Sequence, residues 1–203
     1  MWVKEKFYRL ILINKLFFYI YIILIYLFFI SFSFADLKKN LISKLTTTKT
    51  LTFNFKQKIA DKEENGTCFV KYPLLMKCNY QNIKQKTIIS NGKTVAIIKK
   101  KYKKIYYYPI RATPLFFILK KEKILNLIKN NQPSRITSEL IEFEYIDKKE
   151  KKMFILFDKN TLEFKGWKTT DAYSNHVNFM INDLKTNNPI LDDFFKIPSE
   201  DDL

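Results

Sequence analysis

The chain has few of the residues from which active sites are usually built. It contains one histidine, two cysteines and three glycines among 203 residues. Three glycines leave no glycine-rich loop of the kind that holds phosphates. One histidine and two cysteines do not form a zinc-ligand set, and no nucleophile motif accompanies His176, which is expected to be a surface or structural residue. The sequence therefore predicts a protein that is not an enzyme and has no cofactor or metal site.

Charged residues are absent from one long N-terminal stretch. Leu16–Ile30 contains no charged or amide side chain, and a basic segment at residues 4–15 precedes it. Ser33-Phe34-Ala35 follows with the small-x-small pattern of a cleavage site before Asp36. This order is typical of a secretory signal peptide.

A signal at residues 1–35 leaves residues 36–203 as one exported domain, which is long enough to bury its own core. Because Asp36 and not a cysteine follows the expected cut, no lipid can be attached there. The alternative is an uncleaved anchor, since the apolar run through Ala35 is about as long as a bilayer span. In both cases the domain lies on the far side of the membrane.

Lysine and arginine outnumber the acidic residues, and the formal net charge is +16. Such a surplus usually indicates nucleic acid or anionic lipid as a partner. The abundance of Lys, Asn, Ile, Phe and Tyr also matches what A+T-rich codons encode, so mutational bias explains much of the charge. Because the lysines are spread along the chain and not clustered with stacking aromatics, we expect no nucleic-acid partner.

The two cysteines lie in the exported part. Cys68 and Cys78 are each five residues from Pro73, between two predicted strands at 67–72 and 75–79. A hairpin around Pro73 can place them opposite each other, at a distance that permits a disulfide. Two free buried thiols are the alternative.

Hydrophobic periodicity predicts a short helix at 36–45, capped by Asp36, and then mostly strands. Asn91-Gly92 predicts a tight type I′ hairpin. Thr113-Pro114-Leu115 predicts a helix start, with Thr113 as its cap, and Ile124 marks a second helical turn. Further strands are expected around the following positions: 51–59, 87–98, 104–108, 141–145, 153–157, 162–165 and 173–181. A polar turn is expected at 61–66, directly after the first of these strands.

Short connections between alternating strands indicate an antiparallel meander that is apolar on one face. Such a sheet curls as it grows because strands twist, and the helices must cover its concave side. The predicted fold class is α+β, mainly antiparallel β, in the form of an incomplete, half-open β-barrel with a helical lid.

Several short motifs, in order, resemble those of the periplasmic outer-membrane lipoprotein carrier (LolA) family. The similarity runs through residues 41–198 and rests on these segments: Phe53–Gln57, Gly66 with Lys71-Tyr72-Pro73, Ile89–Lys93, Tyr107–Pro109, Thr113–Leu115, Phe157-Asp158 and Phe194–Pro198. The outer-membrane acceptor LolB shares the fold but carries a lipid, and the missing cysteine at position 36 favours the carrier.

The resemblance implies a monomeric periplasmic carrier whose apolar cavity holds the acyl chains of lipoproteins. It also implies two partners, an inner-membrane ABC lipoprotein-releasing transporter and an outer-membrane lipoprotein acceptor. Many carriers have arginine immediately before the hairpin proline, where it helps to close the lid. Tyr72 stands there in this chain and cannot make the forked contacts of arginine.

Two sets of residues are candidates for this function. The candidate lid residues are Tyr72, Leu115, Ile118 and Leu119. The candidate cavity residues are Leu51, Phe53, Phe55, Leu75, Met76, Ile89, Phe143, Ile155, Phe164, Val177 and Phe179. The second set would line either a packed core or a cavity, so a non-catalytic periplasmic interaction domain, or an anionic-lipid-binding protein with a filled core, is the alternative to a carrier.

Overall fold

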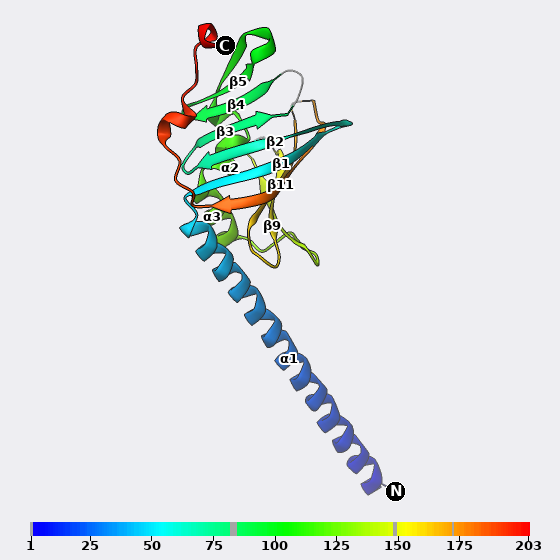
Figure 1. The fold of residues 1–203 in the computed structure, drawn as a ribbon. Coiled ribbons are helices and arrows are strands. Elements are labelled where there is room, and N and C mark those ends of the chain that lie inside the picture. Colours follow the sequence, from blue (N-terminus) through cyan, green and yellow to red (C-terminus); the bar gives the residue numbers. More distant parts are fainter. Residues whose placement is uncertain (1, 82–84, 148–149, 172) are drawn as a thin grey trace. The chain divides into compact units, whose positions relative to one another are not determined.

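The computed structural model describes residues 2–81, 85–147, 150–171 and 173–203, with the side chains of 2–13 and 26–35 left out. The chain divides into two compact units, 1–40 and Leu41–Leu203. Figure 1 shows the ribbon of both, and each is described here by itself.

The first unit is helical and belongs to α1 (Trp2–Thr47). Its side chains from Leu16 to Ile25 are exposed. Among the side chains that the structure describes, no helix is long and apolar enough to cross a membrane. Most of the basic start, residues 4–13, and the Ser33–Ala35 cleavage site of the predicted signal lie outside the described side chains. The expected helix start at Asp36 is wrong, because no proline or glycine interrupts the chain there and α1 continues through it.

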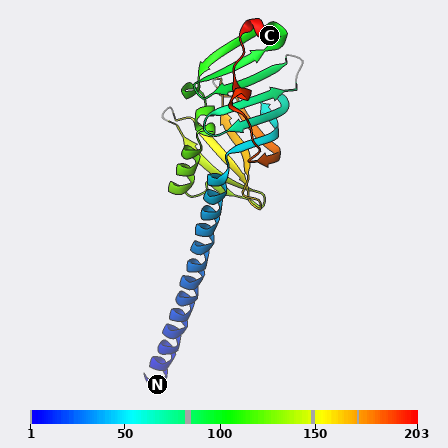
Figure 2. The ribbon, with the colours of Figure 1, turned by 60° about the vertical axis from the view of Figure 1, so that its left-hand side comes forward.

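The second unit is built on one antiparallel sheet. Its eleven strands are β1 (Thr50–Ile59), β2 (Lys62–Lys71), β3 (Leu75–Tyr80), β4 (Lys86–Asn91), β5 (Thr94–Lys99), β6 (Lys104–Pro109), β7 (Arg135–Ile136), β8 (Leu140–Ile146), β9 (Lys152–Asp158), β10 (Phe164–Thr170) and β11 (His176–Thr186). Their order is β6-β5-β4-β3-β2-β1-β11-β10-β9-β8-β7, so β6 and β7 form the two edges. The predicted mainly antiparallel, open β-barrel is confirmed (Figures 1 and 2).

Two short helices, α2 (Leu115–Leu119) and α3 (Lys121–Asn130), follow β6 and contact each other. The Phe117 ring of α2 stacks on Tyr145 of β8, with the ring centres 3.8 Å apart. We call the side of the sheet that bears Tyr145 the inner face. Thr113 does not cap α2 as predicted, because its hydroxyl donates to the Ile110 carbonyl at 2.8 Å.

The C-terminal segment, residues 190–203, covers the opposite, outer face over the first strands (Figure 2). It contains the 3₁₀ turns η3 (Asp192–Phe195) and η4 (Glu200–Asp202). Phe195 is buried, and Ile197 and Leu203 pack against a cluster on β4, β5 and β6 that comprises Ile89, Ala96, Ile98 and Ile105. The prediction that Phe194, Phe195 and Ile197 pack a C-terminal segment is confirmed.

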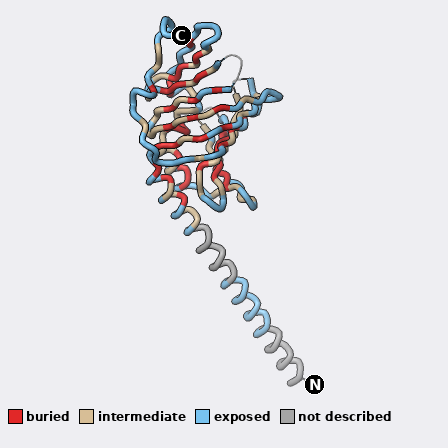
Figure 3. Tube along the Cα trace, in the orientation of Figure 1, coloured by how far each residue is buried: buried red, intermediate tan, exposed pale blue. Residues whose placement is uncertain are grey.

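Apolar residues on both faces of the sheet explain why both faces have a cover. Along β1, Leu51, Phe53 and Phe55 are buried, and the polar residues between them are more exposed (Figure 3). Each strand therefore contributes residues to both faces. The sheet buries its inner residues against the helices and part of its outer residues under the C-terminal segment.

Three predicted boundaries are wrong. Residues 62–66 belong to β2, since they pair with β1 as far as Lys62. Leu162 has a φ of 57° and lies in a turn, and Tyr173 is 86% exposed before β11 begins. The two-residue β4–β5 turn, Gly92-Lys93, has a positive φ at Gly92 but not at Lys93, which is the pattern of a II′ turn and not the I′ turn predicted with Asn91-Gly92.

Cys68 of β2 and Cys78 of β3 are directly opposite in register on the inner face. They are joined by a disulfide with a Cα–Cα distance of 4.1 Å, and both are buried. The bond links neighbouring strands near the centre of the sheet.

We predict that Cys68→Ala/Cys78→Ala lowers the free energy of unfolding by about 2–3 kcal/mol, because the cross-link restricts a short loop of the unfolded chain. Urea unfolding of the purified protein measures the loss. As a control, a reductant should destabilise the wild type and leave the double variant unchanged. A wild-type protein whose cysteines react with an alkylating agent without reduction, under unfolding conditions, contradicts the bond.

Candidate functional site

A chain of aromatic rings crosses the inner face at the centre of the sheet. Phe179 of β11 stacks on Phe55 of β1 at 4.7 Å and on Trp167 of β10 at 3.9 Å between ring centres. Phe55 in turn meets Tyr80 of β3 edge to face at 4.8 Å. Phe179 is therefore the ring at which the two halves of the sheet meet.

The chain of rings continues toward β8. Trp167 stacks on Phe164 at 6.2 Å, Phe164 lies 5.9 Å from Phe157, and Phe157 meets Phe143 at 6.1 Å. These distances are within the range of favourable aromatic pairs. The inner face from β3 to β8 is thus one continuous apolar surface.

Most of the predicted cavity residues come together on this inner face. The buried ones there are Leu51, Phe53, Phe55, Met76, Phe143, Ile155, Phe164, Val177 and Phe179. Leu75 and Ile89 do not join them, because the register places Met76 inside and therefore Leu75 outside, and Ile89 belongs to the cluster under the C-terminal segment.

Sequence reasoning missed two central members of the inner face, Trp167 and Tyr80. Trp167 follows a register shift in β10 that interrupts the alternation. Gly166 makes the shift possible, since its φ is +132° and a Cβ there would lie 2.0 Å from the Phe179 carbonyl oxygen. An isolated glycine in a strand pattern was the signal that could have indicated this bulge.

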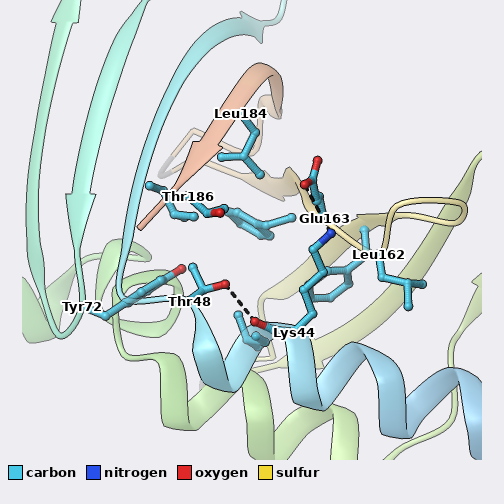
Figure 4. Close-up of a pocket in the computed structure, with 11 residues that line it drawn as sticks. Lys44, Thr48, Tyr72, Leu162, Glu163, Leu184 and Thr186 are labelled. Atoms are coloured by element: carbon cyan, nitrogen blue, oxygen red, sulfur yellow. Dashed lines mark hydrogen bonds and ion pairs between the residues drawn. The ribbon is translucent and has the colours of Figure 1, made fainter. Parts of the chain in front are cut away.

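One pocket opens where α1, β1, β10 and β11 meet (Figure 4). Its volume of about 20 Å³ is room for one water molecule and not for an acyl chain. Lys44 and Glu163 form an ion pair of 3.3 Å on one side, and Tyr72 lies on the other (Figure 4). The pocket is lined by Lys44, Leu45, Thr48, Leu51, Tyr72, Phe157, Leu162, Glu163, Phe164, Leu184 and Thr186.

Tyr72 belongs to the turn between β2 and β3. Its backbone N–H donates to the Lys49 carbonyl at 3.0 Å, and the Lys121 ammonium of α3 lies 5.7 Å from the centre of its ring. Burial raises the pKa of Tyr72, so its hydroxyl stays neutral at physiological pH. The residue that replaces the expected arginine thus packs as a neutral ring beside α3.

The helices are tied to the rest of the unit by a few polar contacts. The Leu74 N–H donates to the Leu119 carbonyl at the end of α2, at 3.0 Å. Lys121 donates to the carbonyls of Thr46 and Thr48, at 2.9 and 2.8 Å. Among the predicted lid residues, Ile118 and Leu119 are buried and Leu115 is half-buried. Phe117, which no sequence pattern singled out, provides the ring contact.

The opposite end of the inner face is polar. The Tyr80 hydroxyl donates to Gln57 Oε1 at 2.8 Å, and the Lys86 ammonium lies 3.7 Å from the centre of the Tyr80 ring. Lys86 also pairs with Glu64. Burial, together with the Glu64 charge, raises the pKa of Tyr80. The apolar surface therefore lies between a small pocket and a polar cluster.

The described residues offer little else for chemistry. His176 is exposed at the start of β11, and among these residues no group of three His, Cys, Asp or Glu side chains could hold a metal ion. The candidate site among the described residues is therefore the apolar inner face.

We predict that Phe179→Ala lowers the free energy of unfolding by about 3–5 kcal/mol, because it leaves a cavity among three aromatic neighbours. Denaturant unfolding checks this. Phe194→Ala, at a ring that is 36% exposed, is the matched control and should cost clearly less. Equal losses at the two positions would mean that Phe179 has no central role.

We predict that the protein loses stability above about pH 10, because Tyr72 has a raised pKa in the folded state. The neutral Tyr72 side chain makes its full contribution to the free energy of unfolding below the ordinary tyrosine pKa of 10.0. As the pH rises above that value, this contribution falls by up to about 1.4 kcal/mol per pH unit. Urea midpoints measured across this range should fall less steeply for Tyr72→Phe than for the wild type. Tyr173→Phe, at an exposed position, should follow the wild type.

The family model "Outer membrane lipoprotein carrier protein LolA" matches residues 46–198. No curated protein matches the sequence. Among solved structures, an uncharacterized conserved protein from Thermus thermophilus is 9% identical, with a TM-score of 0.49 and coverage of 81% of this chain and 94% of that one.

A LolA superfamily protein from Nitrosomonas europaea is 8% identical, with a TM-score of 0.43 and coverage of 78% of this chain and 97% of the other. The MucA/MucB complex of Pseudomonas aeruginosa contains a chain that is 10% identical, with a TM-score of 0.45 and coverage of 81% and 62%. Because the family model matches most of the sequence, from the end of α1 to the C-terminal segment, the chain belongs to the LolA family.

Proposed function

We propose that the protein binds the acyl chains of lipoproteins against the inner face and carries lipoproteins from the inner to the outer membrane. The observation that carries this proposal is the continuous aromatic surface from Tyr80 to Phe143 under α2 and α3. Aromatic and aliphatic walls with few polar groups suit a flexible hydrocarbon guest. Membership of the LolA family supports the same function.

The arrangement corresponds to the closed form of such a carrier. The described pocket has room for about one water molecule, so an acyl chain can enter only if the helical lid, α2 and α3, moves away from the sheet. Opening must break the Leu74–Leu119 hydrogen bond and separate Phe117 from Tyr145. If α3 moves as well, the Lys121 contacts also break.

The energy available from a guest is larger than the energy of these contacts. Burial stabilises by about 0.8 kcal/mol per CH₂, so one sixteen-carbon chain supplies about 12 kcal/mol before costs. An aromatic stack contributes about 0.5–1.5 kcal/mol and a hydrogen bond about 1 kcal/mol. Opening also uncovers buried apolar side chains of α2 and α3, such as Leu119, Ile124 and Ile128, so one acyl chain offsets the opening only if it covers this surface in their place.

Export, the transporter and the acceptor complete the proposal. The N-terminal segment would direct the chain to the periplasm, where LolA-family proteins act. An inner-membrane ABC transporter would supply the lipoprotein, and an outer-membrane acceptor would receive it. Because release requires a competing cavity, we expect the hand-over to be nearly neutral in free energy.

A periplasmic interaction domain with a filled core is the second candidate. The dense ring packing of the inner face and the small pocket favour it. The two functions differ in one property, since only the carrier needs its lid to open.

We predict that a disulfide across the lid abolishes binding of pyrene-labelled palmitate to the exported protein. Leu74→Cys/Leu119→Cys places the new bond where the backbone of the β2–β3 turn meets α2. Fluorescence should show binding to the wild type, loss of binding to the oxidised variant, and recovery on reduction. The locked helix prevents entry, so the effect requires no change in the inner face.

The matched control is Lys58→Cys/Asn178→Cys, which joins two exposed, directly opposed residues of β1 and β11 without touching the helices. This variant should bind like the wild type. Probe binding by the wild type in the presence of reductant shows how much the reduction of the Cys68–Cys78 bond itself changes binding. Binding by the locked variant would refute lid opening, and a folded wild type that binds no acyl probe would refute the carrier function.

A further inference from the structure

The edge of the sheet at β6 carries an unusual surface. The segment Lys99–Pro109, which we call the Lys–Tyr edge, contains five lysines, four tyrosines and no acidic residue. It comprises the 3₁₀ turn η1 (Lys100–Tyr102) and the edge strand β6. Here lysines and aromatics do cluster, contrary to the expectation that the lysines are merely spread along the chain.

The four tyrosines of the Lys–Tyr edge are exposed in spite of their size. Tyr102 is 52% exposed, Tyr106 44%, Tyr107 54% and Tyr108 44%. Large exposed apolar groups that gather in one place usually mark an interaction surface. A tyrosine combines an apolar ring with a polar hydroxyl, so it suits a boundary between water and an apolar phase.

The tyrosines point to both sides of the sheet. Tyr106 and Tyr108 alternate with Tyr107 along β6, so they lie on opposite faces of the strand. Lys99 holds its ammonium 4.9 Å from the centre of the Tyr106 ring. An aromatic platform for nucleic-acid bases needs its rings on one face, whereas an edge with rings on both faces suits insertion into a uniform interface.

The edge is a poor template for adding another strand. The Ile105 N–H donates to Glu200 Oε1 at 3.0 Å, so this residue directs its backbone away from β5. Tyr107 and Pro109 share its orientation in β6, but Pro109 has no N–H, and the N–H of Lys103, just before the strand, donates to the Lys100 carbonyl at 3.0 Å. A partner would therefore contact mainly the side chains of this edge and not its backbone.

We infer that the Lys–Tyr edge docks the protein on the surface of an anionic phospholipid bilayer. Lysines near a membrane surface are attracted by anionic headgroups, and tyrosines are enriched at the level of those headgroups. Glu200 faces this edge at Ile105, but the five lysines leave it strongly positive. Docking does not depend on acyl-chain binding, and it would bring the inner face close to a bilayer.

The test is flotation of the exported protein with vesicles of phosphatidylcholine alone or of phosphatidylcholine with phosphatidylglycerol. The quantity measured is the excess of binding, which is the binding to anionic vesicles minus the binding to neutral ones. This subtraction removes any charge-independent binding by the N-terminal helix. We expect Lys100→Glu/Lys101→Glu/Lys104→Glu to reduce this excess at least about tenfold. Tyr102→Ser/Tyr107→Ser should reduce it as well, and added salt should weaken it in the wild type.

Matched controls separate the edge from net charge. Lys58→Glu/Lys62→Glu/Lys185→Glu reverses three exposed lysines on β1, β2 and β11, and Tyr173→Ser removes an exposed tyrosine elsewhere. Both controls should retain the excess. Equal binding to neutral and anionic vesicles, an equal loss in the lysine control, or stronger binding to a single-stranded DNA oligonucleotide than to anionic vesicles would each overturn the inference.

Discussion

This open antiparallel sheet of eleven strands carries apolar residues on both of its faces, and the rest of the structure follows from the need to cover them. Side chains alternate between the two faces along each strand, and apolar ones lie on both, the aromatic rings inside and the Ile89, Ala96, Ile98 and Ile105 cluster outside. The inner face is covered by α2, α3 and the end of the α1 segment that belongs to the same unit. The outer face is covered in part by residues 190–203. Phe179, at the junction of the two halves, connects the rings that fill the inside.

The two covers of the sheet are held by different contacts. The C-terminal segment is held by buried Phe195, by the Ile197 and Leu203 contacts and by the Lys71–Asp192 ion pair of 2.6 Å. The short α2 has no side-chain cap, and the helices are held by the Phe117 ring contact, a backbone contact at Leu119 and the buried side chains of both helices. The proposed carrier function requires a guest to displace the inner cover.

Much of the fold could be predicted from the sequence because period-two alternation fixes which residues share a face. The strand from Leu51 to Ile59 and the pairing of Cys68 with Cys78 are examples. Alternation fails where a bulge intervenes, which hid Trp167, and where two apolar neighbours compete for one face, which misplaced Leu75 and Ile89. Phe117 was hidden because a five-residue helix is too short to show a face.

The pairing of β1 with β11 has a consequence for biogenesis. These strands are neighbours in the sheet, although more than a hundred residues separate them in the chain. A polypeptide that crosses a membrane N-terminus first delivers β11 and then the C-terminal segment last. Distant pairings also form slowly. In a chain exported as proposed, the two halves of the molecule therefore cannot join until translocation is almost complete.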